Sequence, residues 1–255
     1  MGTLGLEHPA EHVRYRIANV QLNTWPYRHM LVRDAFPSWY YDKLLDHFPP
    51  KDLFSPLSER HQLRLKFDLA GDEDIARLDE PQRSFWSEFQ ELFVNESFMD
   101  SVVEKYCGTT ADRFRGRCWP MVYLFRDTTG YGIGPHPDTR TKLITMLFYL
   151  PRDDSQQQFG TSVLVPKNGS PDPGPHDKLD GWDQFHTVFT APYLPNTLLS
   201  FYVTADSWHA VDTHAEAGER WSLQYFICVD DDNTPRSTPS STNSNTRDPS
   251  DSLYS

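Results

Sequence analysis

The sequence is poor in cysteine, and the few cysteines that it has are far apart. Cys107, Cys118 and Cys228 are an odd number, and none belongs to a Cys-x-x-Cys pair. This usage is more typical of reduced thiols inside a cell than of a disulfide framework or a cysteine zinc site. We therefore expect a cytoplasmic protein.

The chain also lacks a basic surplus and any long apolar run. Lys and Arg total 24 against 36 Asp and Glu, which gives a formal net charge of −12. Because nucleic-acid-binding proteins carry a basic footprint, this balance disfavours a nucleic-acid partner, and it disfavours an anionic membrane surface for the same reason. The N-terminal residues have no basic region followed by an apolar run, and no stretch reaches membrane-spanning length. We expect neither a signal peptide nor a membrane partner.

The first 116 residues are patterned mainly as helices. We expect, in order, a strand over 28–35, a helix that starts at Pro37, a loop with short structure over 51–80, and a helical region over 81–106 with a break near Asn95-Glu96 and a stop at Gly108. The spacing of apolar residues over 81–106 predicts one buried face, and a glycine after the last turn is a common helix end.

After residue 117 the apolar residues alternate, which is typical of strands. Clusters of Gly, Pro, Asp and Ser separate the expected strands, which are 119–126, 131–136, 141–150, 160–165, 185–190, 197–203, 208–211 and 219–229. Helices followed by short strands predict an α+β fold in which N-terminal helices brace a β-sandwich or distorted barrel. The expected organisation is an N-terminal extension (1–27), a helical support region of the same domain (28–116), a β core (117–232) and a disordered tail (233–255).

Two His-x-acid pairs occur, and their surroundings differ. A chain of this composition holds about one and a half such pairs by chance, so a pair alone is weak support for a metal site. His136 and Asp138 stand at the end of an expected strand, where residues two apart point to the same face. The pair of His214 and Glu216 has no apolar alternation around it and is typical of a solvated loop.

A second histidine could complete a metal site with the first pair. His209 follows His136 by 73 residues and lies between the apolar Trp208 and Val211, which predicts a buried imidazole. Two imidazoles and one carboxylate can hold divalent iron on one face and leave positions for oxygen chemistry. A structural, hydrogen-bonded histidine is the alternative.

The last expected strand alternates between polar and aromatic residues from Arg220 to Ile227. Either its polar face lies in water, or its aromatic face packs on the helices while its polar face lines a pocket. In the second case a buried Arg220 needs an anionic partner, which a dicarboxylate ligand could supply through a bidentate contact. On the expected central strand Tyr149 shares a face with Thr145 and Leu147, and core packing is the alternative for this tyrosine.

Together these elements resemble the 2-oxoglutarate/Fe(II)-dependent oxygenases of the double-stranded β-helix fold, a jelly-roll or cupin-like barrel, and within them the prolyl-hydroxylase-like branch. The resemblance covers roughly residues 117–229. It is carried by Gly130-Tyr131 ahead of His136-Pro-Asp138, by Lys142-x-x-Thr145-x-x-x-Tyr149-Leu150, by Gly160-Thr-Ser-Val-Leu-Val-Pro166, by His209-Ala-Val211 and by Arg220-Trp-Ser222.

The resemblance implies a ligand set and a reaction. His136, Asp138 and His209 would bind Fe(II), and the contacts to 2-oxoglutarate would come from Arg220 with Tyr149, from Ser222 or Thr145, and from Tyr123. Ordinary barrel packing is the alternative for Thr145 and Tyr123. With O2 as oxidant, such an enzyme hydroxylates a C–H bond and converts 2-oxoglutarate to succinate and CO2. A carboxylate at position 138 implies hydroxylation rather than halogenation.

The substrate depends on loops that the resemblance does not cover. Residues 152–158 and 167–185 are the candidates, and we hypothesise that 167–185 covers the site with Trp182 as its anchor, a plain surface loop being the alternative. The acidic body and the absence of a peptide-groove signature favour a small molecule such as an amino acid derivative or a sugar. Protein side-chain (prolyl-type) hydroxylation, a non-catalytic metal- or ligand-binding sensor, and a cupin-like metalloenzyme without 2-oxoglutarate stay open. The sequence leaves the oligomeric state open as well.

Overall fold

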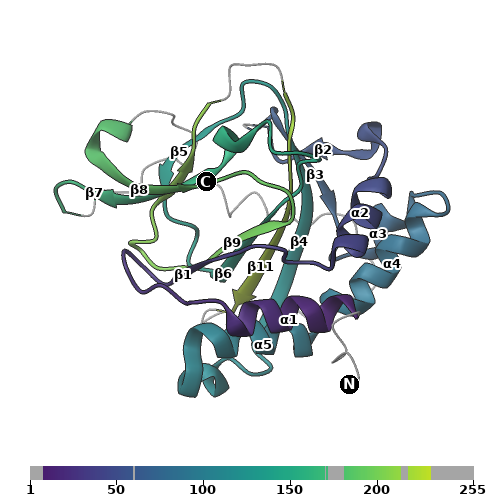
Figure 1. The fold of residues 1–255 in the computed structure, drawn as a ribbon, viewed down its shortest axis with the longest axis horizontal. Coiled ribbons are helices and arrows are strands. Elements are labelled where there is room, and N and C mark those ends of the chain that lie inside the picture. Colours follow the sequence, from purple (N-terminus) through teal and green to yellow (C-terminus); the bar gives the residue numbers. More distant parts are fainter. Residues whose placement is uncertain (1–7, 60, 170, 172–180, 214–217, 231–255) are drawn as a thin grey trace.

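The computed structural model describes residues 8–59, 61–169, 171, 181–213 and 218–230, so the expected tail at 233–255 lies outside the described residues. Two antiparallel sheets face each other, and helices cover the outer side of the larger sheet (Figure 1). Within the described ranges, no helix has the combined length and apolar character that crossing a bilayer requires.

Most of the helices lie before the core strands in the chain. They are α1 (Pro9–Asn19), α2 (Ser38–Asp46), α3 (Asp72–Ala76), α4 (Gln82–Phe93) and α5 (Glu96–Cys107), with short 3-10 turns at Lys51–Leu53, Gly108–Arg113, Gln157–Phe159 and Trp182–Gln184. The break expected near Asn95-Glu96 is confirmed, because the Asn95 side chain accepts a hydrogen bond from the Phe98 backbone N–H at 2.9 Å and caps α5. Gly108 ends α5 with a φ of 53°.

The strands form one seven-stranded and one four-stranded sheet. The strands are β1 (His29–Val32), β2 (Ser55–Pro56), β3 (Arg64–Asp68), β4 (Cys118–Asp127), β5 (Ile133–His136), β6 (Lys142–Tyr149), β7 (Thr161–Pro166), β8 (Phe185–Ala191), β9 (Thr197–Tyr202), β10 (His209–Val211) and β11 (Arg220–Val229). The sheet orders are β1-β9-β6-β11-β4-β3-β2 and β5-β10-β7-β8. Every strand expected after residue 117 is present. The arrangement is consistent with a jelly roll, although the described strands form two separate sheets rather than a closed barrel.

The two faces of β11 have different surroundings, as the pocket interpretation requires. Leu223, Tyr225 and Ile227 belong to the large core between the sheet and the helices, and the Tyr225 hydroxyl donates to the Phe93 backbone oxygen of α4 at 3.0 Å. The opposite face turns toward the small sheet and carries Arg220. The packing of the aromatic face on the helices is therefore confirmed.

Helix α1 and strand β3 are among the elements that are not predicted from the sequence. Helix α1 buries Ala10, Val13 and Ile17 in the same core as α4 and α5. Strand β3, within the stretch expected to be a loop with short structure, adds to the large sheet beside β4. In this pairing Arg64 lies opposite Asp127, so β3 brings a cationic side chain to the inner face of the sheet.

Candidate active site

The two histidines of the expected metal site lie side by side. Strand β10 pairs with β5 so that His209 is directly opposite His136, and the two ring centroids are 4.3 Å apart. His136 is 7% exposed and His209 is 6% exposed. Antiparallel pairing thus brings together residues that are far apart in the sequence, and the expected burial of His209 is confirmed.

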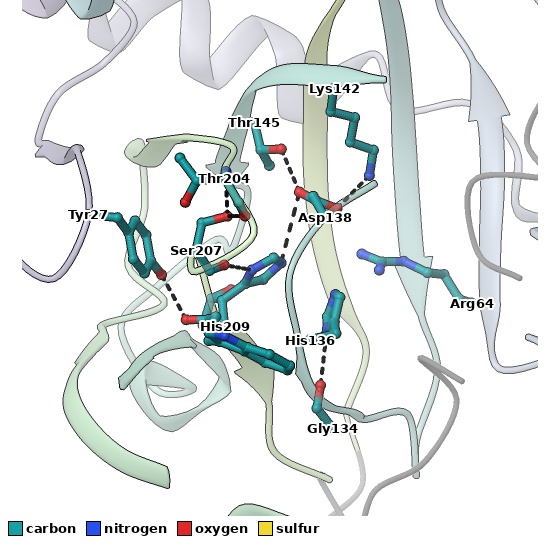
Figure 2. A network of polar contacts seen from close by, with 12 residues as sticks. Tyr27, Arg64, Gly134, His136, Asp138, Lys142, Thr145, Thr204, Ser207 and His209 are labelled. Atoms are coloured by element: carbon teal, nitrogen blue, oxygen red, sulfur yellow. Dashed lines mark hydrogen bonds and ion pairs between the residues drawn. The ribbon is translucent and has the colours of Figure 1, made fainter. Parts of the chain in front are cut away.

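Backbone carbonyl groups fix which nitrogen each imidazole presents to the pocket. His136 Nδ1 lies 2.7 Å from the Gly134 oxygen, and His209 Nδ1 lies 3.0 Å from the Ser207 oxygen (Figure 2). Because a carbonyl oxygen can only accept, each Nδ1 carries the proton. Both Nε2 atoms therefore hold lone pairs that can bind a metal, which is the usual arrangement for metal-ligating histidines.

The turn before His209 is itself held in place. Ser207 Oγ donates to the Thr204 oxygen at 2.8 Å and accepts from the Thr204 N–H at 3.0 Å. Tyr27, which precedes β1, donates its hydroxyl hydrogen to the Trp208 oxygen at 2.9 Å. These bonds orient the carbonyl that sets the His209 tautomer (Figure 2).

Asp138 completes the group. One candidate ligand atom from each of His136, Asp138 and His209 lies within 4.8 Å of the others, and Asp138 Oδ2 is 4.0 Å from His209 Nε2. Lys142 Nζ donates to Asp138 Oδ1 at 2.7 Å, and Thr145 Oγ1 donates to Oδ2 at 2.6 Å. Each carboxylate oxygen thus has a fixed orientation.

The charges around Asp138 keep it ionised. Burial on its own would raise the pKa of this carboxyl, but the Lys142 ammonium, which donates to it, holds the pKa well below its usual range. Two imidazole lone pairs and one ionised carboxylate form the donor set of a facial Fe(II) site. The residues present therefore fit the metal that the sequence resemblance implies.

The lowered pKa of Asp138 predicts how stability depends on pH. A carboxyl whose pKa is lower in the folded chain stabilises the fold above its unfolded pKa of about 4, and this contribution is lost as the pH falls toward the folded pKa. The difference in unfolding free energy between the metal-free protein and its Asp138→Asn variant should be constant above about pH 5 and shrink below about pH 4. Urea unfolding of both proteins at several pH values measures this difference. A difference that does not change with pH would contradict a lowered pKa for Asp138.

Arg220 lines the same pocket as the metal-binding group. It is 2% exposed, and the pocket between the two sheets is lined by Arg220 together with His136, Asp138 and His209. Its Nε donates to the Phe159 oxygen at 2.7 Å, and its Nη2 donates to Thr161 Oγ1 at 3.3 Å.

The chain itself supplies an anionic partner to Arg220. Arg220 Nη1 donates to Asp127 Oδ2 at 2.8 Å, and Arg64 Nε lies 3.1 Å from Asp127 Oδ1. The register places Asp127 of β4 opposite both arginines, which come from the neighbouring strands β11 and β3. The expectation that a buried Arg220 needs an anionic partner is confirmed, but the partner in the structure is Asp127 of the same chain, and a dicarboxylate as a further partner stays a prediction.

Removing this carboxylate should destabilise the fold. Asp127 is 2% exposed, so Asp127→Asn would leave two buried arginines without their shared charge. Breaking a buried ion pair costs roughly 3–5 kcal/mol, and we expect a loss of that order in denaturant unfolding. Asp206→Asn, at an exposed turn, is the control and should change stability by less than about 0.5 kcal/mol. A comparably small loss for Asp127→Asn would show that the arginines are balanced elsewhere.

The remaining predicted contacts lie at different depths. Thr145 lines the pocket and binds Asp138, whereas Tyr149 and Ser222 are fully buried behind the lining. The Tyr149 hydroxyl accepts from the Thr161 N–H at 3.2 Å, and its ring lies 5.4 Å from the Arg220 guanidinium carbon. Tyr123 is opposite Gln224 on the inner face, but it packs in a separate cluster with Phe125.

Lys142 and Gln224 line the pocket but are not singled out by the sequence as site residues. Lys142 is 3% exposed, and its ammonium lies 3.9 Å from the Phe226 ring centroid. No local signal identifies it, because a spacing of four residues brings side chains together in a helix, whereas Asp138 lies in the connection between β5 and β6. Gln224 stands on the polar face of β11, where its amide donates to Ser222 Oγ at 3.2 Å.

The loop hypotheses are only partly covered by the structure. Most of the segment 167–185, and the pair of His214 and Glu216, lie outside the described residues. At the described ends of the first segment, the Lys167 N–H donates to the Gln184 oxygen at 2.8 Å, and Trp182 packs against a cluster that includes Trp208. Trp182 is thus anchored beside the strand that carries His209, and its role as a lid anchor stays a prediction.

Comparison with known proteins gives structural matches only. No protein-family model matches the sequence, and no curated protein sequence matches it. A prolyl 4-hydroxylase from Phytophthora capsici is 16% identical with a TM-score of 0.54, over 92% of this chain and 69% of that chain. A Pseudomonas putida prolyl 4-hydroxylase is 13% identical with a TM-score of 0.51, over 87% and 100% of the two chains.

A plant oxygenase has a similar structure. The dioxygenase for auxin oxidation 1 from Arabidopsis thaliana, solved as a binary complex with 2-oxoglutarate, is 13% identical with a TM-score of 0.52, over 88% of this chain and 89% of that chain. At these identities the likeness is one of fold. This chain has the fold of the 2-oxoglutarate/Fe(II)-dependent oxygenases, including the prolyl 4-hydroxylases, as the sequence resemblance predicts.

Proposed function

We propose that the chain is a 2-oxoglutarate- and Fe(II)-dependent dioxygenase with a double-stranded β-helix core, which hydroxylates a C–H bond of a small molecule. The observation that carries the proposal is that one pocket is lined by the group of His136, Asp138 and His209 and also by Arg220. A metal and the far end of a dicarboxylate could therefore be held at the same time. The structures of similar fold support the reaction class.

The residues have distinct roles in this proposal. His136 and His209 would bind Fe(II) through Nε2, and Asp138 through Oδ2, the oxygen nearer His209. Arg220, with Tyr149 and Ser222 behind it, would bind the distal carboxylate of 2-oxoglutarate, and Thr145 would orient Asp138. When bound, Fe(II) and 2-oxoglutarate let O2 oxidise a C–H bond to an alcohol, with release of succinate and CO2. The buried pocket walls would keep water from the reacting groups.

Lys142 would determine how Asp138 binds the metal. Its ammonium occupies Oδ1, so only Oδ2 is directed at the histidines. A carboxylate that would hold Fe(II) through one oxygen alone would leave more room at the metal for other groups than a carboxylate that would hold it through both.

Protein side-chain hydroxylation is a second candidate function, because two of the structures of similar fold are prolyl 4-hydroxylases. The sequence also leaves open a non-catalytic sensor and a cupin-like enzyme that works without 2-oxoglutarate. Because Asp127 is a partner of Arg220, the burial of Arg220 does not by itself distinguish an oxygenase from these two kinds of protein. Turnover of 2-oxoglutarate distinguishes them, because only the oxygenase converts it to succinate.

Succinate formation tests the proposal. The protein is incubated in air with Fe(II) and 2-oxoglutarate, and succinate is quantified by chromatography. We expect slow succinate formation even without the substrate, its loss in His209→Ala, and no change in His186→Ala, which removes an exposed histidine of β8. If iron binds and no succinate forms with any of a panel of small acids, amino acids, sugars and proline peptides, the oxygenase proposal fails.

A further inference from the structure

A buried glutamine beside the proposed metal site has hydrogen-bonding groups that the protein leaves open. Gln224 of β11 is 4% exposed and lines the same pocket as His136, Asp138 and His209. Within the described ranges its side chain has a single hydrogen bond, which its amide donates to Ser222 Oγ at 3.2 Å. The amide oxygen of Gln224 is not fully enclosed by protein atoms, so it borders the pocket. The proposed roles of the site residues do not use this side chain.

The open groups of Gln224 are suited to a ligand. A carboxamide donates through its N–H groups and accepts through its oxygen, and the bond to Ser222 leaves the oxygen and the second N–H of Gln224 available. Polar groups in a buried site cost free energy unless they find a partner. Other polar residues of the pocket already have one, since Lys142 and Thr145 both donate to Asp138.

Strand register places Gln224 between the two ends of the proposed co-substrate site. On β6, Thr145 lies at the level of the metal-binding group and Tyr149 lies at the level of Arg220. Gln224 is opposite Leu147, which stands between these two residues. In the proposed function, the part of 2-oxoglutarate between its oxo group and its far carboxylate consists of methylene groups, which form no hydrogen bonds. The open groups of Gln224 are therefore left for the substrate.

The chemical group that fits Gln224 best is another primary carboxamide. Its N–H and oxygen lie side by side, so it can donate to the Gln224 oxygen and accept from the Gln224 N–H at the same time. A carboxylate has no hydrogen to donate to that oxygen. A trans peptide bond carries its N–H and its C=O on opposite sides, so it cannot present both to one side chain.

We propose that Gln224 binds a primary carboxamide of the substrate, and that the substrate is therefore a small amide rather than a sugar or a peptide segment. This inference rests on the proposed function and narrows it. Ser222 would hold the Gln224 amide in place. The carbon chain of such an amide would pack on the apolar side chains that line the same pocket, which include Ile133, Val211 and Phe226.

A purely structural role for Gln224 predicts something different. In that case the bond to Ser222 is its whole contribution, and water occupies its open groups. Replacing Gln224 would then change the stability of the protein without changing which ligands it prefers.

The test compares propionamide with two analogues of similar size. Butan-2-one has a methyl group in place of the amino group, and N-methylpropionamide has a trans amide that represents a peptide bond. Dissociation constants are measured by saturation-transfer NMR titration with the full chain, with and without Mn(II) and 2-oxoglutarate. In the wild type we expect propionamide to bind roughly tenfold more tightly than either analogue, because each analogue can form only one of the two hydrogen bonds.

Substitution of Gln224 should remove this preference. Gln224→Met keeps the size of the side chain without its amide, so butan-2-one, the more apolar probe, should bind at least as tightly as propionamide. Gln21→Met, at an exposed position before β1, is the control and should keep the wild-type preference. If Gln224→Met does not fold, Gln224→Asn keeps the amide on a stem shorter by one methylene group, and it should also lose most of the preference.

The outcomes separate this inference from the proposed function. Equal binding of propionamide and butan-2-one to the wild type, or an unchanged preference in Gln224→Met, would overturn the inference. Tightest binding of N-methylpropionamide would overturn it in favour of a peptide substrate. Binding of Mn(II) and 2-oxoglutarate is followed by calorimetry in the same proteins. If these two do not bind and the amide preference holds, the proposed function fails and the amide site stands.

Discussion

Asp138→Ala is expected to abolish succinate formation and to weaken metal binding by more than roughly 100-fold. The loss of a residue that only supports a metal ligand can already weaken binding by that factor, and here the ligand itself is lost. The variant removes a ligand, and it also removes the carboxylate to which Lys142 and Thr145 donate. Because Lys142 is 3% exposed, the free energy of unfolding should fall as well, by roughly 3–5 kcal/mol. Calorimetric titration with Mn(II) and denaturant unfolding measure the two effects.

The loss of the ligand can be separated from the loss of stability. The double variant Asp138→Ala/Lys142→Met removes both charges of the buried pair, so it should recover much of the stability without recovering metal binding. Asp206→Ala, at an exposed position, is the matched control and should leave both measurements unchanged. Metal binding within about tenfold of wild type in Asp138→Ala would show that the carboxylate is not a ligand.

Arg220→Leu is expected to raise the 2-oxoglutarate concentration needed for half-maximal succinate formation by roughly 100-fold or more. A hydrogen bond to a charged group contributes roughly 1.5–3 kcal/mol, and a bidentate contact would lose two of them. Metal affinity should not change, because Arg220 is not among the grouped ligand atoms. A rise in the KM for 2-oxoglutarate without a loss of metal affinity is the signature of a co-substrate contact.

Two further variants make this result specific. Arg220→Lys keeps the charge next to Asp127 but loses the planar fork, so its KM should lie between those of the wild type and Arg220→Leu. Arg115→Leu removes an exposed arginine that is distant in the sequence from Arg220, and its KM for 2-oxoglutarate should equal that of the wild type. An unchanged KM in Arg220→Leu would mean that Arg220 serves only as the buried partner of Asp127.

The strands of the core and the metal-binding group could be predicted from the sequence, because both depend on local patterns. Alternating apolar residues mark β4 through β11, and the position of His136 and Asp138 at a strand end places both side chains on one side. No local signal in the sequence predicts that His209 lies opposite His136, and this pairing is seen only in the register of β10 against β5.

Some features could not be predicted, because they depend on strand register or on weak local patterns. Strand β3 has only two apolar residues, Leu65 and Phe67, so neither its existence nor its position beside β4 is visible. Without that register, nothing connects Arg64 to Asp127. Asp127 itself ends a strand next to a turn, where an acidic residue is ordinary. A buried ion pair between sequence-distant strands becomes apparent only in three dimensions.

The most direct test of the proposed function is the anaerobic addition of 2-oxoglutarate to the Fe(II)-loaded protein, followed by absorption spectroscopy. Binding of the co-substrate at the iron should produce a visible metal-to-ligand charge-transfer band. The band should be absent in Asp138→Ala, and in Arg220→Leu it should be absent at concentrations that saturate the wild type. Iron binding with no such band at any 2-oxoglutarate concentration would contradict the proposal that this pocket holds the two together.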